Sequence, residues 1–264
     1  DYVPPQQIRA TLESKAAAGL FLAGQINGTS GYEEAGGQGL LAGVNAARYC
    51  RKEEMVTLGR DQCYIGVMID DLVTRGVDEP YRMFTSRAEY RLLLRGDNAD
   101  ERLTPVGRRW GLVDDKRWQA FERKQGEVRE LTDYLQQKRL EGKTLAQWIR
   151  QQEKDGEWLI TQEPELAGKK YGKFAFQQAI NNLKYSGYVE KQLRLISRFQ
   201  KMEEWRLPKD MDYGTIPQLR QEARERLNQF QPLNLGQASR ISGITPSDIT
   251  VLMIFMDQKR GVGK

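Results

Sequence analysis

A glycine-rich stretch near the start of the chain carries the residue types best suited to binding a small ligand. Residues 23–35 read Ala-Gly-Gln-Ile-Asn-Gly-Thr-Ser-Gly-Tyr-Glu-Glu-Ala. Glycines at three positions let the backbone turn sharply and approach a ligand closely. The amide and hydroxyl groups between them can donate and accept hydrogen bonds. The dinucleotide fingerprint Gly-x-Gly-x-x-Gly is not repeated here, so the stretch predicts either a ligand-binding loop or an ordinary glycine-rich connection.

Two elements must position this loop. Residues 19–24 form a short apolar run bounded by glycines, as a buried strand does. Residues 35–48 follow with apolar side chains at helical spacing. We therefore expect strand, loop and helix in succession. The N–H groups at the start of that helix would suit a phosphate or the edge of a flavin.

The composition excludes several kinds of catalyst. The 264 residues include no histidine, so neither a Ser-His-Asp triad nor a zinc site built with histidine can form within the chain. Cys50 and Cys63 lack metal-binding spacing and are expected to be reduced thiols. The aspartate pairs at 70–71 and 114–115 are interpreted as turn or helix-cap residues. The sequence therefore predicts no metal site and no catalytic residue.

Charge and length give broader expectations. The net charge is +5 and the pI about 9.1, which suits either an acidic partner or a moderately basic soluble protein. The length predicts about two domains, and 29% charged residues indicate helices with wide solvated faces. No apolar run approaches the roughly 20 residues that span a bilayer, and no signal peptide is visible. We expect no membrane association.

Basic residues gather in two further stretches. Ser86 and Glu89 have capping-box spacing, which predicts a helix over 87–95. Its three arginines would share one face, where they could bind phosphates or pair with nearby carboxylates. Residues 174–184 and 188–205 are expected to be two helices joined at a glycine. Their basic side chains and Tyr185 and Tyr188 would face RNA, although the residues alone favour tyrosines packed in a core. The candidates for RNA contact are Arg87, Arg91, Arg95, Lys184, Lys191, Arg194 and Arg198.

Most of the remaining chain is also predicted to be helical. Residues 62–73 are compatible with helix or strand, and 153–172 with a flexible connection. The helix expected at 247–257 is too apolar to be fully exposed, so it packs into a bundle or against another protein. Leu252 and Phe255 are its candidate partner contacts. Further helices are expected at 8–18, 105–111, 116–140, 145–152, 217–230 and 233–242.

Three blocks of the chain form a recognisable set: the loop at 23–35, the stretch 79–104 that begins Glu-Pro-Tyr-Arg-Met-Phe-Thr-Ser-Arg, and residues 236–246, Gly-Gln-Ala-Ser-Arg-Ile-Ser-Gly-Ile-Thr-Pro. They resemble the MnmG/GidA family, flavoproteins that modify the wobble uridine of certain tRNAs. They occur in the order of the family's C-terminal part. The chain starts without methionine and lacks the family's upstream flavin-binding half and catalytic cysteines. We therefore expect a fragment of a longer polypeptide. Glycines at 36 and 37 replace the usual alanines, which predicts a looser helix start.

The resemblance implies a mainly α fold, in which helical C-terminal domains follow the last strand, loop and helix of a Rossmann-type FAD-binding domain. The expected domains are 1–50, the end of the FAD-binding domain; 51–175, a helical domain; and 176–264, a helical domain for tRNA and partner binding. The loop would close one side of the flavin site. The implied cofactor-binding residues are Gly24, Gln25, Asn27, Gly28, Thr29, Gly31 and Tyr32.

The resemblance also implies an activity. Family members act with the GTPase MnmE, use FAD, NADH and methylene-tetrahydrofolate, and attach a carboxymethylaminomethyl-type group to C5 of wobble uridine in tRNA. They are dimers, and the implied location is the cytoplasm, or the mitochondrion in eukaryotes. This fragment alone would be inactive. The alternative is a non-catalytic helical adaptor that binds RNA or a partner protein.

Overall fold

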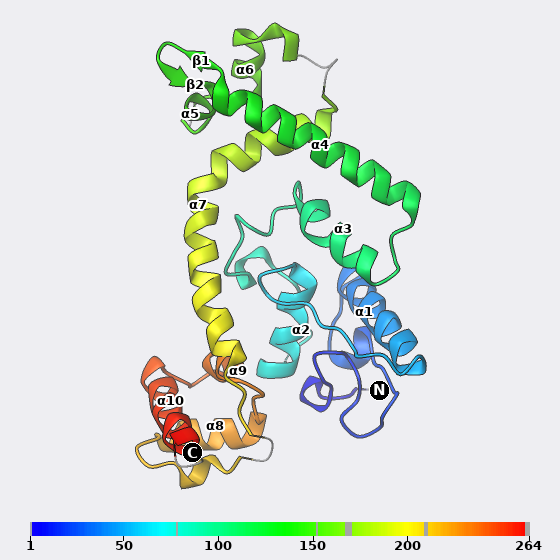
Figure 1. Ribbon diagram of the computed structural model, residues 1–264. Helices are drawn as coiled ribbons and strands as arrows, with labels where there is room; N and C mark the ends of the chain where they lie inside the picture. Colours follow the sequence, from blue (N-terminus) through cyan, green and yellow to red (C-terminus); the bar gives the residue numbers. More distant parts are fainter. Residues whose placement is uncertain (1, 78, 152, 167–170, 209–210, 262–264) are drawn as a thin grey trace. The chain divides into compact units, whose positions relative to one another are not determined.

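The computed structural model describes residues 2–77, 79–151, 153–166, 171–208 and 211–261, and these are mainly helical, as predicted (Figure 1). The chain divides into two compact units. The first comprises Asp1–Arg60, Tyr64–Ala88 and Arg194–Lys264, and the second Asp61–Cys63 and Glu89–Leu193. Each unit gathers segments that are distant in the sequence. The domain limits expected at residues 50 and 175 stay predictions.

The first unit opens with irregular chain followed by two packed helices. Helix α1 spans Tyr32–Cys50 and α2 spans Tyr64–Arg75, and the two pack together. Single turns of 3-10 helix precede and follow them: η1 at Pro5–Gln7, η2 at Gly24–Asn27 and η3 at Thr85–Arg87. The apolar core of this part includes Ile8, Leu12, Leu41, Val67 and Leu72.

A small helical bundle closes the first unit. It consists of η5 (Tyr213–Thr215), α8 (Gln221–Phe230), α9 (Leu235–Arg240) and α10 (Pro246–Gly261), and is called the C-terminal bundle below. It follows the end of α7, which spans Lys173–Glu204. The buried side chains of the bundle form one cluster. Helix α9 packs against both α10 and α2.

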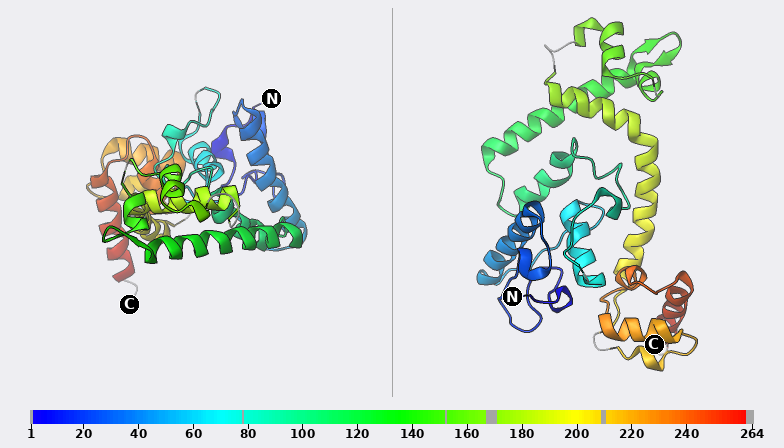
Figure 2. Two further views of the ribbon diagram at one scale, coloured as in Figure 1. Left: turned by 90° about the horizontal axis from the view of Figure 1, so that it is seen from above. Right: turned by 180° about the vertical axis from the view of Figure 1, so that it is seen from behind.

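The second unit is built on α4 (Asp115–Gln137) and the first turns of α7, which lie side by side in both figures and share one core (Figure 2). It also contains α3 (Ala99–Arg109), α5 (Leu145–Ile149), α6 (Gly156–Gln162) and η4 (Pro164–Leu166). Strands β1 (Arg139–Leu140) and β2 (Lys143–Thr144) form an antiparallel hairpin, with Arg139 opposite Thr144. Core side chains include Leu131, Leu135, Ile149, Leu159 and Ile180.

Several elements begin where local chemistry places them. Asp114 caps α4 by accepting the Arg117 N–H at 2.7 Å. Thr144 forms a capping box with Gln147 at α5. At α10, Thr245 and Asp248 satisfy each other's N–H groups. The ambiguous stretch at 62–73 forms helix α2, and the helices expected at 217–230, 233–242 and 247–257 form with shifted limits.

The chain before α1 differs from expectation. The helix predicted at 8–18 is absent, because residue 12 has φ +66° and sits in a tight turn, where Leu12 N–H donates to the Arg9 carbonyl. The strand predicted at 19–24 is reduced to one isolated bridge between Phe21 and Glu13. A strand needs a series of backbone hydrogen bonds to a neighbouring strand, and among the described residues this segment has only the one bridge.

The helix predicted at 87–95 does not form. Turn η3 ends at Arg87 because Ala88 is extended, and tight turns follow it. The N–H groups of Leu93 and Leu94 both donate to the Tyr90 carbonyl in a single turn. Gln192 also accepts the Leu93 N–H, and Asn98 donates to the Leu93 carbonyl, so side chains complete the bonding of this turn.

Three other boundaries are also wrong. Helix α7 runs without interruption through Gly187, a residue that costs a helix only about 1 kcal/mol relative to alanine. Helix α3 begins at Ala99, and Pro105 lies inside it. The connection expected at 153–172 contains α6, because Asp155 accepts the Trp158 N–H at 3.0 Å and caps a helix there.

Candidate functional site

Gln38 holds the glycine-rich loop from inside α1. Its Oε1 accepts the Gly24 N–H and the Asn27 side-chain amide, both at 2.9 Å. Its Nε2 donates to Thr29 Oγ1 at 3.1 Å. The side chains of Gln38, Asn27 and Thr29 are buried. The loop is therefore pinned at three points by one amide.

Tyr81 fixes the other edge of the loop through its backbone. Its N–H donates to the Gly28 carbonyl at 2.7 Å, and its carbonyl accepts from the Ser30 N–H at 3.4 Å. Gly28 has φ +77°, and a Cβ there would lie 2.7 Å from a methyl group of Val77. Only glycine therefore fits this position without strain.

A cavity of about 420 Å³ lies along the outer edge of the loop. Gln25 is exposed there, and its side-chain amide forms no hydrogen bond with the described part of the chain. An amide of this kind can donate to and accept from the polar edge of a ring system. The cavity is lined by Tyr2, Gln25, Gly28, Thr29, Ser30, Val77, Glu79 and Pro80.

The N-terminus of α1 already holds a carboxylate. Glu34 is buried and its Oε1 accepts the Met83 N–H at 2.9 Å. This hydrogen bond holds the pKa of Glu34 below its usual range. A Cβ on Gly31 would overlap the Glu34 carboxylate, at 1.8 Å from Oε2. The anionic side chain opposes a phosphate at this helix end, so an uncharged ring edge fits the loop better.

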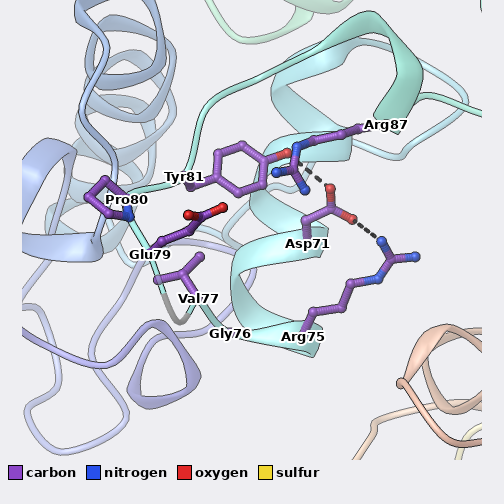
Figure 3. Close-up of a pocket in the computed structure, with 8 residues that line it drawn as sticks. All are labelled: Asp71, Arg75, Gly76, Val77, Glu79, Pro80, Tyr81 and Arg87. Carbon is purple, nitrogen blue, oxygen red and sulfur yellow. Dashed lines mark hydrogen bonds and ion pairs between the residues drawn. The ribbon is translucent and has the colours of Figure 1, made fainter.

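A second cavity, of about 450 Å³, lies beside helix α2 (Figure 3). The Arg87 guanidinium stacks on the Tyr81 ring, 4.4 Å from its centroid. The Tyr81 hydroxyl donates to Asp71 Oδ2 at 2.9 Å, and Arg75 Nη1 lies 3.5 Å from Asp71 Oδ1. Burial, and then the neighbouring Asp71 carboxylate, raise the pKa of Tyr81, so its hydroxyl stays a donor at neutral pH. Gly76, Val77, Glu79 and Pro80 complete the lining.

Comparison with known proteins identifies the family. A model of the MnmG/GidA C-terminal helical domain matches residues 115–193, one of the MnmG/GidA C-terminal helical bundle matches 195–264, and one of glucose inhibited division protein A matches 1–54. The chain belongs to the MnmG/GidA family. The three models together cover most of its length.

Relatives and solved structures agree with this assignment. The chain is 48% identical over 273 residues to the tRNA uridine 5-carboxymethylaminomethyl modification enzyme MnmG of Syntrophotalea carbinolica, covering 97% of this chain and 44% of the relative. The protein of the same name from Rhodopirellula baltica is 48% identical over 262 residues, with 97% and 40% covered. The structure of Aquifex aeolicus GidA matches with a TM-score of 0.84 at 40% identity, covering 96% of this chain and 42% of that one. The chain thus spans less than half the length of its MnmG relatives.

The residues expected at the flavin fall into three groups. Gln25, Gly28 and Thr29 line the first cavity. Gly24 and Asn27 are buried and bonded to Gln38. Gly31 precedes α1 beside Glu34, and the Tyr32 side chain is 95% exposed. Their contact with a flavin stays a prediction.

The structure separates the arginines expected on one helix face. Arg87 lies in the first unit and lines the second cavity. Arg91 and Arg95 belong to the second unit. Arg91 is exposed, whereas Arg95 donates to the Asp97 carboxylate at 3.0 Å and to Asn182 Oδ1 at 2.6 Å. Arg95 therefore follows the alternative prediction of pairing with a nearby carboxylate. Because the helix predicted at 87–95 does not form, the three arginines do not share a helix face.

The basic residues of α7 are more accessible. Lys191 and Arg194 are exposed and Lys184 is half-buried beside a cavity of the second unit. Tyr188 is 61% exposed, so its expected packing in a core is wrong. Tyr185 is partly buried, with the Arg95 guanidinium 5.3 Å from its ring centroid. The side chain of Arg198 lies outside the described residues.

The partner contacts expected on α10 need correction. Leu252 is fully buried in the core of the C-terminal bundle, and Phe255 packs partly buried against the same core. Ile254 is instead the large apolar side chain exposed on this helix, at 53%. The apolar composition of α10 is explained mainly by its own bundle.

Sequence reasoning missed Gln38, Tyr81 and Arg60. A glutamine on a glycine-rich helix is typical of a solvated face, and its burial depends on tertiary packing. Arg60 is buried under α2, although arginine side chains usually lie at the surface. Among the described residues, no cluster of ligating side chains could hold a metal ion. The helices searched in the described ranges include none with the length and apolarity needed to span a bilayer.

Proposed function

We propose that this chain forms part of an MnmG-type, FAD-dependent enzyme that adds a carboxymethylaminomethyl-type group to C5 of wobble uridine in tRNA. In this proposal the enzyme acts with an MnmE-type GTPase in the cytoplasm, with NADH and methylene-tetrahydrofolate as co-substrates. The names of the relatives support the reaction. The observation that carries the role of this chain is the pinned loop at residues 24–31, which presents Gln25 to a cavity.

The loop fits one edge of a flavin ring system. The cavity of about 420 Å³ is within the range of small-molecule sites but suits only part of a dinucleotide cofactor. Gln25 would orient the ring through its amide, while the Gly28 backbone lets the ring approach closely. Glu34 would keep phosphate away from the start of α1. When bound, the flavin would transfer reducing equivalents; this chain would hold and orient its edge.

The test of the flavin role is Gln25→Ala in the MnmG-type flavoprotein that carries this sequence. We expect weaker FAD retention, measured as flavin absorbance per protein after gel filtration. Gln119→Ala, at an exposed position of α4, is the matched control. Unchanged FAD occupancy in the Gln25 variant would remove this residue from the site.

The tRNA role would rest on the exposed face of α7. Lys184, Tyr188 and Lys191 are spaced four and three residues apart in one continuous helix, so they share a face. Two cations and an exposed aromatic ring would suit a phosphate backbone with a splayed base. Arg91, which is exposed, and Arg87, at the second cavity, are further candidates. Arg194 would extend the basic surface.

Binding to the GTPase would involve the exposed surface of α10. Ile254 on α10 is a better candidate for a protein contact than Leu252, because its side chain is accessible. Ile254→Asp should weaken binding to the GTPase without unfolding the bundle. Size-exclusion chromatography with light scattering tests the expected homodimer. A monomer at micromolar concentration would contradict it for this chain.

A further inference from the structure

Arg240 and Asp70 join the C-terminal bundle to helix α2. Arg240, the last residue of α9, places Nε 2.7 Å from Asp70 Oδ2 and donates from Nη2 to Oδ1 at 2.9 Å. Its remaining Nη1 lies 3.0 Å from Glu203 Oε1. The side chains of Arg240 and Asp70 are only 13% and 14% exposed. A two-point contact of this kind fixes orientation as well as distance.

Arg60 continues the contact from Asp70 to Asp71. Its Nη1 lies 3.2 Å from Asp70 Oδ2 and 2.7 Å from Asp71 Oδ1, and its side chain is 7% exposed. Gly66 makes this approach possible, because a Cβ there would lie 2.1 Å from the Gly59 carbonyl oxygen. Arg60 therefore bridges two neighbouring carboxylates from beneath α2.

Asp71 completes the chain of contacts to the glycine-rich loop. Its Oδ2 accepts the Tyr81 hydroxyl at 2.9 Å. The backbone of Tyr81 in turn bonds to Gly28 and Ser30 at the edge of the first cavity. Each step lies within the first unit. An unbroken series of polar contacts thus runs from α9 to the loop.

We propose that Arg240, Asp70, Arg60 and Asp71 are positioning residues that set the loop at Gly28–Ser30, so that a change at the end of α9 alters the loop. The identity of the loop's ligand rests on the proposed function; the coupling does not. Removing one member would leave a poorly solvated charge without its partner, which favours rearrangement of the remainder over simple loss of one contact.

Native-state hydrogen exchange of the Tyr81 and Ser30 amides measures this coupling in the complete chain without any ligand. Arg240→Gln should raise their exchange rates by roughly two- to thirtyfold, the usual range for coupling through such networks. Tyr81→Phe, which removes only the hydroxyl that binds Asp71, should also raise them. If the coupling depends on that hydroxyl, Arg240→Gln should raise the exchange rates of the two amides little further when Tyr81 is already phenylalanine.

Arg220→Gln is the matched control. It breaks an arginine–carboxylate pair inside the C-terminal bundle, to Asp248, and does not touch the network. We expect it to leave the Tyr81 and Ser30 amides unchanged. An equal increase in both arginine variants would mean general loosening of the bundle and would overturn the proposal. Strictly additive effects of Arg240→Gln and Tyr81→Phe would also overturn it.

A flavin readout separates this proposal from the proposed function. In the flavoprotein that carries this sequence, Arg240→Gln should shift the visible absorbance or reduction potential of the flavin, whereas Arg220→Gln should not. Altered amide exchange without any flavin binding would support the network and contradict the flavin site. Flavin binding together with unaltered amide exchange in the Arg240→Gln variant would support the flavin site and contradict the network.

Discussion

Gln38 Oε1 lies 2.9 Å from Asn27 Nδ2, and both side chains are completely buried. The same oxygen accepts the Gly24 N–H, and Asn27 also donates to the Leu22 carbonyl at 2.8 Å. The side-chain amide of Gln38 therefore holds the loop in place of the backbone hydrogen bonds that a neighbouring strand would provide. Buried polar networks of this kind are costly when incomplete, because every remaining group loses water without gaining a partner.

The first prediction concerns Gln38. Gln38→Leu keeps the approximate shape but leaves the Gly24 N–H and the Asn27 amide short of an acceptor, so the first unit should lose about 3 kcal/mol of unfolding free energy. Urea denaturation followed by tryptophan fluorescence and circular dichroism measures the loss. Gln119→Leu, on an exposed part of α4, should change stability by less than about 0.5 kcal/mol. Equal values for the two variants would show that the network is not formed.

Sequence reasoning was most accurate where a structure depends on neighbours along the chain. The caps at Asp114 and Thr144 need only residues three positions away; α5 begins at residue 145 as predicted, and α4 begins one residue before its predicted start. The helix expected at 87–95 is absent because Ala88 is extended, and the segment that follows makes turns in which Gln192, about a hundred positions away, also accepts the Leu93 N–H. No local pattern contains that partner.

At the candidate site, too, the sequence predicts local features but not contacts between distant segments. Glycine spacing indicated the loop, and Gln25 and Gly28 do line a cavity. The groups that hold the loop come from α1, α2 and the segment around Tyr81, and only folding brings them together. Leu252 was assigned to a partner because an apolar helix looks the same whether its own bundle or another protein covers it.

The second prediction tests the continuity of α7. Gly187 lies inside a helix and a Cβ there would meet nothing within 4 Å, so Gly187→Ala should stabilise the chain by about 1 kcal/mol. Gly111 is equally open but has φ +78°, so Gly111→Ala should instead destabilise by about 1 kcal/mol. Chemical denaturation compares the two. Destabilisation by Gly187→Ala would indicate a break in the helix.

The third prediction concerns the acid stability of the C-terminal bundle. Arg220 Nη2 lies 2.7 Å from Asp248 Oδ2, and this hydrogen bond lowers the pKa of the buried Asp248 to about 2. An unfolded aspartate has a pKa of about 3.9, so the Asp248 carboxylate, held by Arg220 and by hydrogen bonds from Thr245, contributes about 2 kcal/mol above that pH. The contribution should vanish as pH falls from about 4 through 2, since protons then bind the unfolded chain first.

Asp248→Asn provides the measurement. Its unfolding free energy should be about 2 kcal/mol below that of the unchanged chain at pH 7, and the difference should shrink below pH 4. Asp257→Asn, at an exposed position of the same helix, should show neither effect. A pH-independent difference would mean that the ionised carboxylate of Asp248 is not what stabilises the bundle.

The last prediction tests tRNA binding on α7. Lysine contacts with phosphates release counterions, so the affinity for an unmodified tRNA transcript should fall steeply with salt. Lys191→Gln should reduce the slope of log affinity against log salt by about 0.7–0.9, the value of one phosphate contact. Lys116→Gln, at an exposed position of α4, removes the same charge and should leave the slope unchanged. The two variants have equal net charge, so a difference between them can come only from where the charge lies. Equal slopes would mean that α7 attracts RNA through the net charge of the chain and not through contacts of its own.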